Sequence, residues 1–191
     1  MKRVFLFFLI SVLVLIPPTT FSRTDAVFTI VLDAGHGGKD PGNLGTGRYK
    51  ETEKQITLAV TLKLGEYIEK NLQDVKVVYT RKDDTYPTLW QRVNIANGAK
   101  ADLFISIHCD AFTNSNAYGS GSYIMGLDFT EHNLRMAKKE NSSIFLEENY
   151  EENYDGFDPN SIESVIALTL NQSVYMDKSI QIAQKIQEQF R

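Results

Sequence analysis

The sequence predicts an α/β fold with a mostly parallel twisted sheet, helices on both faces and a helical C-terminal insertion. Two observations indicate this class. Short apolar runs typical of buried strands alternate with longer segments of helical periodicity, and the region after residue 140 has helical patterns without a further strand. A helix between two strands returns the chain to the same edge of a sheet, so the strands pair in parallel. The length of 191 residues is that of one domain.

Four strands are predicted. Residues 28–32 read FTIVL, residues 75–80 read VKVVYT, and residues 103–108 read LFISIH. Each run is short, rich in β-branched or aromatic side chains and bounded by turn or polar residues, which favours a strand over a helix. A fourth strand is predicted at residues 120–126, SGSYIMG.

Two helices are predicted between the first three strands. In residues 53–71, apolar side chains recur at four-residue steps, which is typical of the stripe that a helix turns toward a core. The stripe consists of Ile56, Val60, Leu64 and Ile68, with Ala59 and Tyr67 beside them. A shorter helix in residues 88–100 closes at Asn97-Gly98, a common C-terminal stop.

The rest of the chain is predicted to be helical with one irregular segment. Helices are expected at about residues 130–140, at 161–172 and from Asp177 onward. Residues 147–160, EENYEENYDGFDPN, combine acidic, aromatic and turn residues without a clear period. This composition predicts an inserted loop.

Residues 1–22 have the pattern of a secretory signal peptide. Lys2 and Arg3 precede an apolar run at residues 4–16, and small side chains mark a cleavage site before Arg23. A helix over that run measures roughly 20 Å, against about 30 Å for a membrane's hydrocarbon core, so it is too short for a permanent span. We therefore expect a periplasmic or secreted protein, with a retained N-terminal anchor as the alternative.

Charge and cysteine content exclude some classes of partner and of fold stabilisation. Without Lys2 and Arg3, the chain carries 18 basic and 24 acidic side chains, a formal charge of −6. Such a surface repels phosphate backbones, so we expect no nucleic-acid partner. Cys109 is the only cysteine, so an internal disulfide is excluded and a metal or the core must supply rigidity. We expect a monomer.

A glycine-rich segment, DAGHGGKDPG, follows the first predicted strand. Glycines in that position commonly bind phosphate. The spacing excludes both common phosphate motifs, because the sixth position counted from Gly35 is Asp40 rather than glycine, and Gly38-Lys39 is followed by Asp40 rather than Ser or Thr. The segment therefore favours another ligand.

A metal site is the better interpretation, because two histidines follow predicted strand ends. His36 comes four residues after Leu32, and His108 ends the third strand. The carboxyl ends of parallel strands meet at the edge where α/β folds bind ligands. Glu53 begins the next helix and completes a set of two imidazoles and one carboxylate, which is found in many catalytic zinc sites. A structural or surface role is the alternative for each histidine, and Cys109 is expected to point away as buried packing.

The motifs resemble those of the zinc-dependent N-acetylmuramoyl-L-alanine amidases of bacterial cell walls. The matching segments lie in order, at compatible spacing, within residues 27–125. Ala34 stands where the family usually has proline, which affects loop stiffness only. The segments are DAGHGG at 33–38, EK at 53–54, TRKDDTYPTLWQRVNIAN at 80–97 and SIH at 106–108.

This resemblance implies that residues 27–191 form an amidase catalytic domain in which His36, Glu53 and His108 bind Zn²⁺. Glu51 is a weaker candidate, because its place before the helix gives it a less fixed direction. The implied reaction is hydrolysis of the amide between the lactyl group of N-acetylmuramic acid and L-alanine in peptidoglycan. Zinc would polarise the carbonyl, and its water would attack.

Residues 140–176 resemble the regulatory insertion of the division-associated members of this family, where a helical segment covers the metal. Glu140, Glu147 and Glu148 are candidates for a carboxylate that occupies the open coordination position. A solvated acidic loop is the alternative for each. The resemblance implies self-inhibition, relieved by an activator protein that displaces the insertion.

The resemblance breaks at the C-terminal end. The family closes its sheet with a strand that ends in Glu-Thr-Gly, whose Glu acts as a general base or stabilises the developing charge. This chain stops at Arg191 before such a stretch. We therefore expect an incomplete domain without an identified catalytic residue. Three function classes remain open: a zinc amidase, a non-catalytic zinc- or peptidoglycan-binding remnant, and a zinc carboxypeptidase or deacetylase acting on another cell-wall bond.

Overall fold

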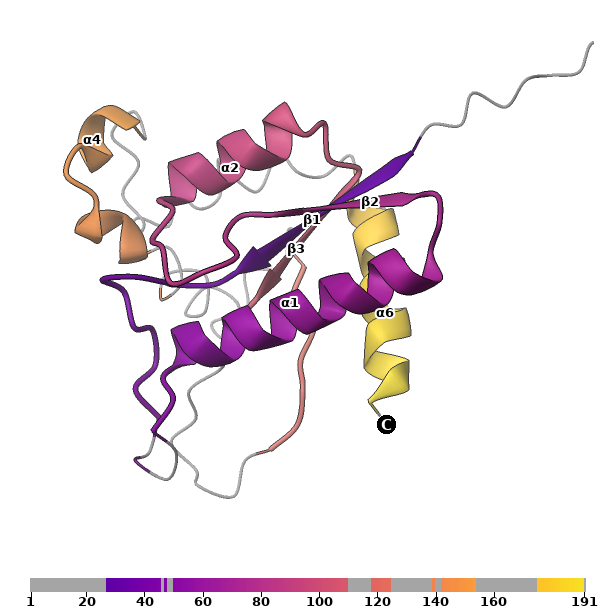
Figure 1. Cartoon of the computed structure of the whole chain (residues 1–191), viewed down its shortest axis with the longest axis horizontal. Coiled ribbons are helices and arrows are strands. Elements are labelled where there is room, and N and C mark those ends of the chain that lie inside the picture. The colour runs from indigo at the N-terminus through magenta and orange to yellow at the C-terminus, as the bar shows by residue number, and fades with distance from the viewer. Residues whose placement is uncertain are drawn as a thin grey trace, which may run out of the picture.

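The computed structural model describes residues 27–45, 47, 50–109, 118–124, 139, 142–153 and 175–190. Figure 1 shows the strands at the centre of the molecule with helices around them. In chain order the elements are β1 (Phe28–Ala34), α1 (Glu53–Asn71), β2 (Val75–Tyr79), α2 (Leu89–Gly98), β3 (Leu103–Ile107), the 3₁₀ helix η1 (Ser142–Leu146), α4 (Tyr150–Asn153) and α6 (Met176–Gln189).

The described strands form one parallel sheet in the order β2-β1-β3. Leu32 of β1 lies opposite Tyr79 of β2, and Ala34 lies opposite Ile107 of β3. All three strands therefore end at the same edge. This arrangement confirms the α/β class and the parallel pairing predicted from the alternation of strands and helices.

The central strand β1 carries most of the core. Residues from Thr29 through Ala34 are buried without interruption. Successive side chains of a strand point to opposite faces, so this pattern means that both faces of β1 are covered. In Figure 1, α1 runs along one side of the strands and α2 along the other.

The helix α1 turns a different stripe to the sheet from the one expected. Its buried positions are Glu53, Thr57, Thr61 and Gly65, whereas Ile56 and Val60 are 40% and 48% exposed. The expectation of an inward apolar stripe was therefore wrong for these two side chains, and also for Ala59 and Tyr67, which are exposed.

Small side chains explain which stripe is buried. A Cβ atom on Gly65 would overlap the Tyr79 ring of β2, so the helix approaches the sheet too closely for a larger residue there. The Thr57 hydroxyl also donates to the backbone oxygen of Gly35, 2.9 Å away. Both stripes repeat at the same four-residue step, so periodicity alone cannot choose between them.

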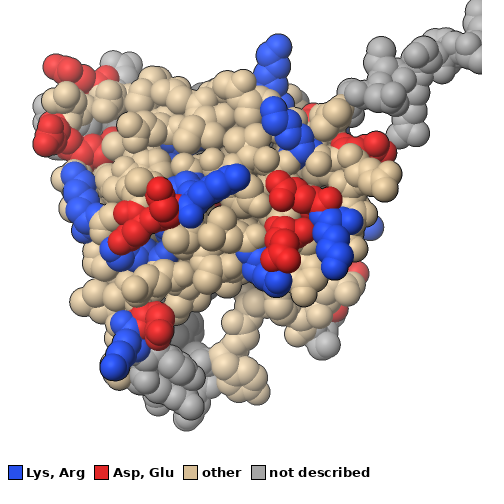
Figure 2. Space-filling view, viewed as in Figure 1, with Lys and Arg blue, Asp and Glu red and all other residues tan. Residues whose placement is uncertain are grey.

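The outer surface of α1 is mixed in charge. Lys63 and Glu66 form an exposed ion pair at 2.8 Å. Figure 2 shows basic and acidic side chains next to one another on this face, with uncharged side chains between them.

Strand ends differ slightly from the predicted ranges. β1 extends to Ala34 rather than ending at residue 32, while β2 and β3 each end one residue early. Thr80 and His108 therefore stand directly after strands instead of within them. Residues 118–124 form no strand, so the fourth strand predicted at 120–126 is wrong for the part described.

The C-terminal region is described in part. The helix α6 confirms the prediction of a helix from Asp177, and α4 adds one short helical turn within the segment predicted as a loop. The signal peptide, the helix predicted at 161–172 and all of the helix at 130–140 except Lys139 lie outside the described residues. Within the described residues, no helix has the length and apolar character needed to cross a membrane.

Two threonines one turn apart on α1 allow a matched stability test. Thr61 is buried, and its hydroxyl oxygen has no hydrogen-bond partner among the described residues. Thr61→Val should therefore raise the free energy of unfolding by about 1 kcal/mol, because a methyl group needs no partner. The melting temperature should rise by about 2–4 °C.

Thr57→Val is the matched control with the opposite sign. It removes the hydrogen bond from the Thr57 hydroxyl to Gly35 and should lower the free energy of unfolding by about 1 kcal/mol. Denaturant melts of both variants measure the two values. Equal destabilisation by the two substitutions would contradict the environment described for Thr61.

Candidate metal centre

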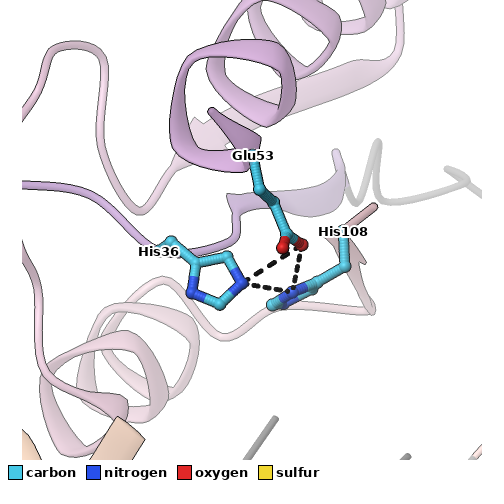
Figure 3. A group of neighbouring side chains, drawn as sticks. All are labelled: His36, Glu53 and His108. Carbon is cyan, nitrogen blue, oxygen red and sulfur yellow. Dashed lines mark hydrogen bonds and ion pairs between the residues drawn. The ribbon is translucent and has the colours of Figure 1, made fainter. Parts of the chain in front are cut away.

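Three side chains from three separate elements converge at the carboxyl edge of the sheet. His36 lies in the loop after β1, Glu53 is the first residue of α1, and His108 follows β3 directly. In Figure 3 the two imidazoles and the carboxylate point toward one another. The register that aligns the ends of β1 and β3 is what brings the two histidines together.

The distances within this group are those of donor atoms that could share one ion. His36 Nε2 lies 3.1 Å from Glu53 Oε1, His108 Nδ1 lies 3.3 Å from the same oxygen, and the two nitrogens are 3.2 Å apart. One ligand atom from each residue falls within 4.8 Å of the others. The structure thus brings together the three residues predicted as ligands.

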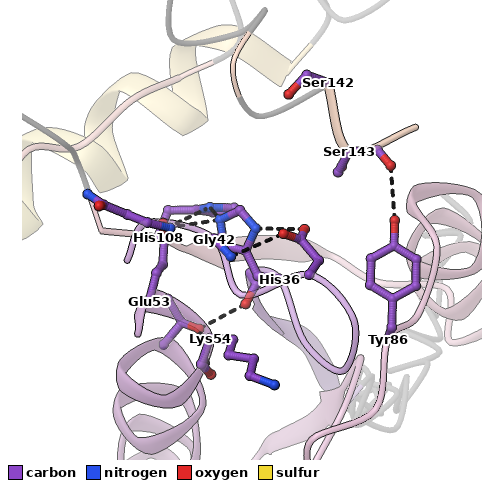
Figure 4. Close-up of polar contacts among 12 residues, drawn as sticks. His36, Gly42, Glu53, Lys54, Tyr86, His108, Ser142 and Ser143 are labelled. Atoms are coloured by element: carbon purple, nitrogen blue, oxygen red, sulfur yellow. Dashed lines mark hydrogen bonds and ion pairs between the residues drawn. The ribbon is translucent and has the colours of Figure 1, made fainter. Parts of the chain in front are cut away.

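Two glycines are required by the rings and the carboxylate that lie against them. A Cβ on Gly35 would stand 2.5 Å from Cε1 of His108, and one on Gly42 would stand 2.5 Å from Cδ2 of His36. The same Cβ on Gly42 would lie 2.8 Å from Glu53 Oε2 (Figure 4). Any larger residue would push a candidate ligand out of place, which explains why Gly35 and Gly42 are glycines.

Both carboxylate oxygens of Glu53 are held by backbone donors. The amide of Cys109 donates to Oε1 at 2.7 Å, and that of Asn43 donates to Oε2 at 2.8 Å. Burial alone would raise the pKa of Glu53, but hydrogen bonds from both histidines and both amides outweigh it and hold the pKa well below its usual range. Glu53 is therefore ionised at neutral pH.

Cys109 takes part in the centre through its backbone amide, which holds Glu53. The sequence does not predict this contact. Its side chain is only partly buried, so the expectation of buried packing was too strong. Because Cys109 directly follows His108, its backbone amide lies close enough to donate to Glu53.

Asp40 contacts a candidate ligand and is absent from the residues predicted for the site. Its Oδ2 accepts a hydrogen bond from His36 Nδ1 at 2.8 Å, and its Oδ1 accepts from the amide of Gly42 at 3.1 Å. Carboxylates commonly hold metal-binding histidines in this way, fixing the ring and leaving the other nitrogen for the ion. The spacing of four residues after His36, inside the glycine loop, was the available signal.

The surroundings of His36 shift its pKa strongly. Burial by itself lowers this pKa, but hydrogen bonds and charges from Asp40 and Glu53 outweigh burial and raise it to about 9. Without a metal, the ring is a cation between two carboxylates. A metal would replace the proton on Nε2.

The backbone of His36 is fixed by a second buried network. His36 has a φ of 60°, in the left-handed region. Arg92 of α2 donates to the backbone oxygens of Ala34 and His36, both at 2.8 Å. Its guanidinium also donates to Asp33 Oδ1 at 2.5 Å, which anchors it at the end of β1.

The remaining predicted carboxylates lie elsewhere. Glu51 is exposed and stands outside the His36, Glu53 and His108 group. Glu147 is 6% exposed, and its Oε1 accepts a hydrogen bond at 2.9 Å from the amide of Leu89, the first residue of α2. Glu148 is exposed, and Glu140 lies outside the described residues.

Two further contacts tie η1 to the loops beside the centre. Lys39 Nζ donates to the backbone oxygen of Leu146 at 2.6 Å, and the Tyr86 hydroxyl donates to that of Ser143 at 3.0 Å (Figure 4). Ile144, between them, is buried. The segment that begins the predicted insertion is thus attached near the glycine loop.

Comparisons with known proteins agree with the resemblance seen in the motifs. A family model described as N-acetylmuramoyl-L-alanine amidase matches residues 30–191. The N-acetylmuramoyl-L-alanine amidase AmiC of Escherichia coli O6:H1 is 42% identical over 101 residues, which are 53% of this chain and 24% of AmiC. AmiA of Escherichia coli K12, which bears the same enzyme name, is 40% identical over 96 residues, which are 50% of this chain and 32% of AmiA.

The chain therefore spans about a quarter to a third of the length of these curated relatives. Among solved structures, the catalytic domain of CwlV, an N-acetylmuramoyl-L-alanine amidase from Bacillus (Paenibacillus) polymyxa var. colistinus, is 36% identical. That comparison covers 58% of this chain and 60% of CwlV, with a TM-score of 0.47.

The raised pKa of His36 predicts a pH dependence of stability in the metal-free protein. In the folded chain His36 keeps its proton up to a pKa of about 9, against about 6.5 in the unfolded chain. Its contribution to stability is therefore complete below about pH 6.5 and is lost as the pH rises through about 9. Denaturant melts of chelator-treated protein across this window measure the decline.

Asp40→Asn provides the control for this dependence. The variant removes one of the charges that favour protonated His36, so it should be destabilised relative to the parent more at about pH 6.5 than at about pH 9. A difference between the two proteins that stays constant over the window would contradict the coupling of Asp40 to His36.

Proposed function

Because the chain belongs to the N-acetylmuramoyl-L-alanine amidase family, we propose that it is a zinc-dependent hydrolase of peptidoglycan. The bond cleaved is the amide between the lactyl group of N-acetylmuramic acid and L-alanine. The observation that carries this proposal is the convergence of His36 Nε2, Glu53 Oε1 and His108 Nδ1 on one point.

The residues of the group fit a zinc ion. Two imidazole nitrogens and one carboxylate oxygen are the protein ligands of many catalytic zinc sites, which leave a fourth position for water or substrate. His36 also has the carboxylate neighbour, Asp40, that such ligands usually have. Glu53 is ionised, as a ligand must be, and both of its oxygens have fixed directions.

Bound by these residues, zinc would supply a Lewis acid that polarises the scissile carbonyl and activates water. The protein's own part is to keep the donor atoms in position. Asp40 orients the His36 ring so that Nε2 faces the other ligands, and the amides of Cys109 and Asn43 hold the Glu53 carboxylate. These contacts hold the three ligand atoms in fixed directions.

Export would bring the enzyme to its substrate. We propose that residues 1–22 act as a signal peptide and that the protein works in the periplasm or outside the cell. The support is the charge and apolar pattern of these residues.

We also propose that residues 140–176 restrict access to the centre and that an activator protein displaces them. The contacts of Leu146 with Lys39 and of Ser143 with Tyr86 attach the start of this segment beside the glycine loop. Glu147 adds a hydrogen bond at the N-terminus of α2, where a helix dipole favours a negative charge. A segment held in this way would limit the approach of a polymeric substrate.

Two glutamates two residues apart provide a matched test of the catalytic proposal. The parent should release dye from labelled peptidoglycan in the presence of zinc and lose this activity after chelation. Glu53→Gln should lower both metal content and release, the latter at least about 100-fold, because a bound metal lowers the activation barrier by several kcal/mol. Glu51→Gln should match the parent, since Glu51 is exposed outside the group.

The products distinguish the remaining function classes. Mass spectrometry should find muramic acid with an unsubstituted lactyl carboxylate and stem peptides that begin with L-alanine. Shortened stem peptides would instead indicate a carboxypeptidase, and loss of acetyl groups a deacetylase. Binding to cell-wall sacculi without release of dye would contradict catalysis and indicate a binding module.

Glu147→Ala tests the restriction of access. Loss of the hydrogen bond to Leu89 should loosen the segment and raise the rate of dye release about tenfold, because a hydrogen bond to a charged group contributes about 1.5 kcal/mol. Metal content should not change. Glu148→Ala, at the exposed neighbouring position, is the control, and activation by this variant alone would assign the restriction to Glu148 instead.

A further inference from the structure

Arg81 is a buried cation that contacts both segments carrying the candidate ligands. The residue follows β2 by two positions and is 3% exposed. One of its terminal nitrogens, Nη2, donates to the backbone oxygen of Gly35 at 2.9 Å and to that of Lys54 at 2.8 Å. Gly35 precedes His36, and Lys54 follows Glu53.

The rest of the guanidinium extends this connection. Nε donates to the backbone oxygen of Ala34 at 2.9 Å, and Nη1 donates to that of Asp83 at 2.9 Å. The Thr57 hydroxyl of α1 donates to the same Gly35 oxygen, at 2.9 Å. The loop of His36 and the first turn of α1 are thus joined through one carbonyl group and one guanidinium.

The cost of this arrangement argues against simple space filling. A buried cation loses its hydration, and the described hydrogen bonds of Arg81 end on backbone carbonyl oxygens and the Thr57 hydroxyl rather than on a carboxylate. Burial and the nearby charge of Arg92 lower the pKa of Arg81, and the charges of Asp84, Asp33 and Asp83 offset this only in part. An apolar side chain would fill the same space without either penalty. Arginine therefore suits position 81 because its planar guanidinium can donate several hydrogen bonds in fixed directions.

We propose that Arg81 is a positioning residue that sets the spacing between the backbones of His36 and Glu53, so that their ligand atoms face one cation. The inference rests on the proposed function, because it assumes that these residues bind a metal. Lysine cannot replace arginine in this role, since a single ammonium nitrogen cannot reach carbonyl oxygens in three separate segments.

The test compares Arg81→Lys with Lys82→Gln, a variant of the exposed neighbouring cation. The dissociation constant for Zn²⁺ is measured by competition with a chromogenic chelator, and the coordination geometry by the visible spectrum of the Co²⁺ form. Arg81→Lys should bind Zn²⁺ about 10–100-fold more weakly, the usual effect of losing a residue that orients a ligand. Its Co²⁺ bands should change in position and intensity. Lys82→Gln should match the parent in both measurements.

A purely structural role for Arg81 gives a different result. Arg81→Lys would then melt at a lower temperature in the metal-free form but show the parent's Zn²⁺ affinity and Co²⁺ spectrum, and this outcome overturns the inference. A parent that binds neither ion would overturn the proposed metal site itself, and the role of Arg81 with it.

A second measurement does not depend on the folding of a variant. In the parent protein, the Nε–H signal of Arg81 in a nuclear magnetic resonance spectrum should shift on addition of one equivalent of Zn²⁺. The reason is that the same guanidinium donates through Nη2 to the backbone oxygens of Gly35 and Lys54, which adjoin His36 and Glu53. An Nε–H signal that does not change while the ring signals of His36 and His108 do would overturn the inference.

Discussion

The rest of the site depends on the hydrogen bonds and the ion pair made by the buried carboxylate of Asp33. It lies near the end of β1 and accepts hydrogen bonds from Thr80 after β2 and from Ser106 of β3, both at 2.6 Å. Its ion pair with Arg92 attaches α2 to the same point. One side chain therefore joins the carboxyl ends of all three strands to a helix, and the loops that leave these ends begin from fixed positions.

The organisation of the centre follows from that junction. Arg92, held by Asp33, donates to the backbone oxygen of His36 and so supports the left-handed conformation of this residue. Asp40 then orients the imidazole ring, and Arg81 connects the loop to the start of α1. Arg92 and Arg81 make these contacts to backbone oxygens, and Asp40 makes its contact to the ring itself. Such contacts fix the direction of ligand atoms.

These requirements also explain why α1 faces the sheet with polar and small residues. Glu53, Thr57 and Gly65 occupy the inner face, where they provide a ligand atom, a hydrogen bond to the glycine loop and room for the Tyr79 ring. Ile56 and Val60, on the neighbouring stripe, stay about half exposed.

The sequence by itself determined the three described strands to within two residues, the bounds of α1, and the positions of His36, Glu53 and His108 after strands or at a helix start. These features depend on local periodicity and on parallel strands ending at one edge. Only the tertiary structure decided which face of α1 is buried, where Glu147 lies and what Asp40, Arg81 and Arg92 hold. Most of these facts depend on contacts between residues far apart in the chain, and no local pattern encodes such contacts. Asp40 is the exception, since it stands close to His36 in sequence, but its role becomes visible only when His36 turns its other nitrogen toward Glu53.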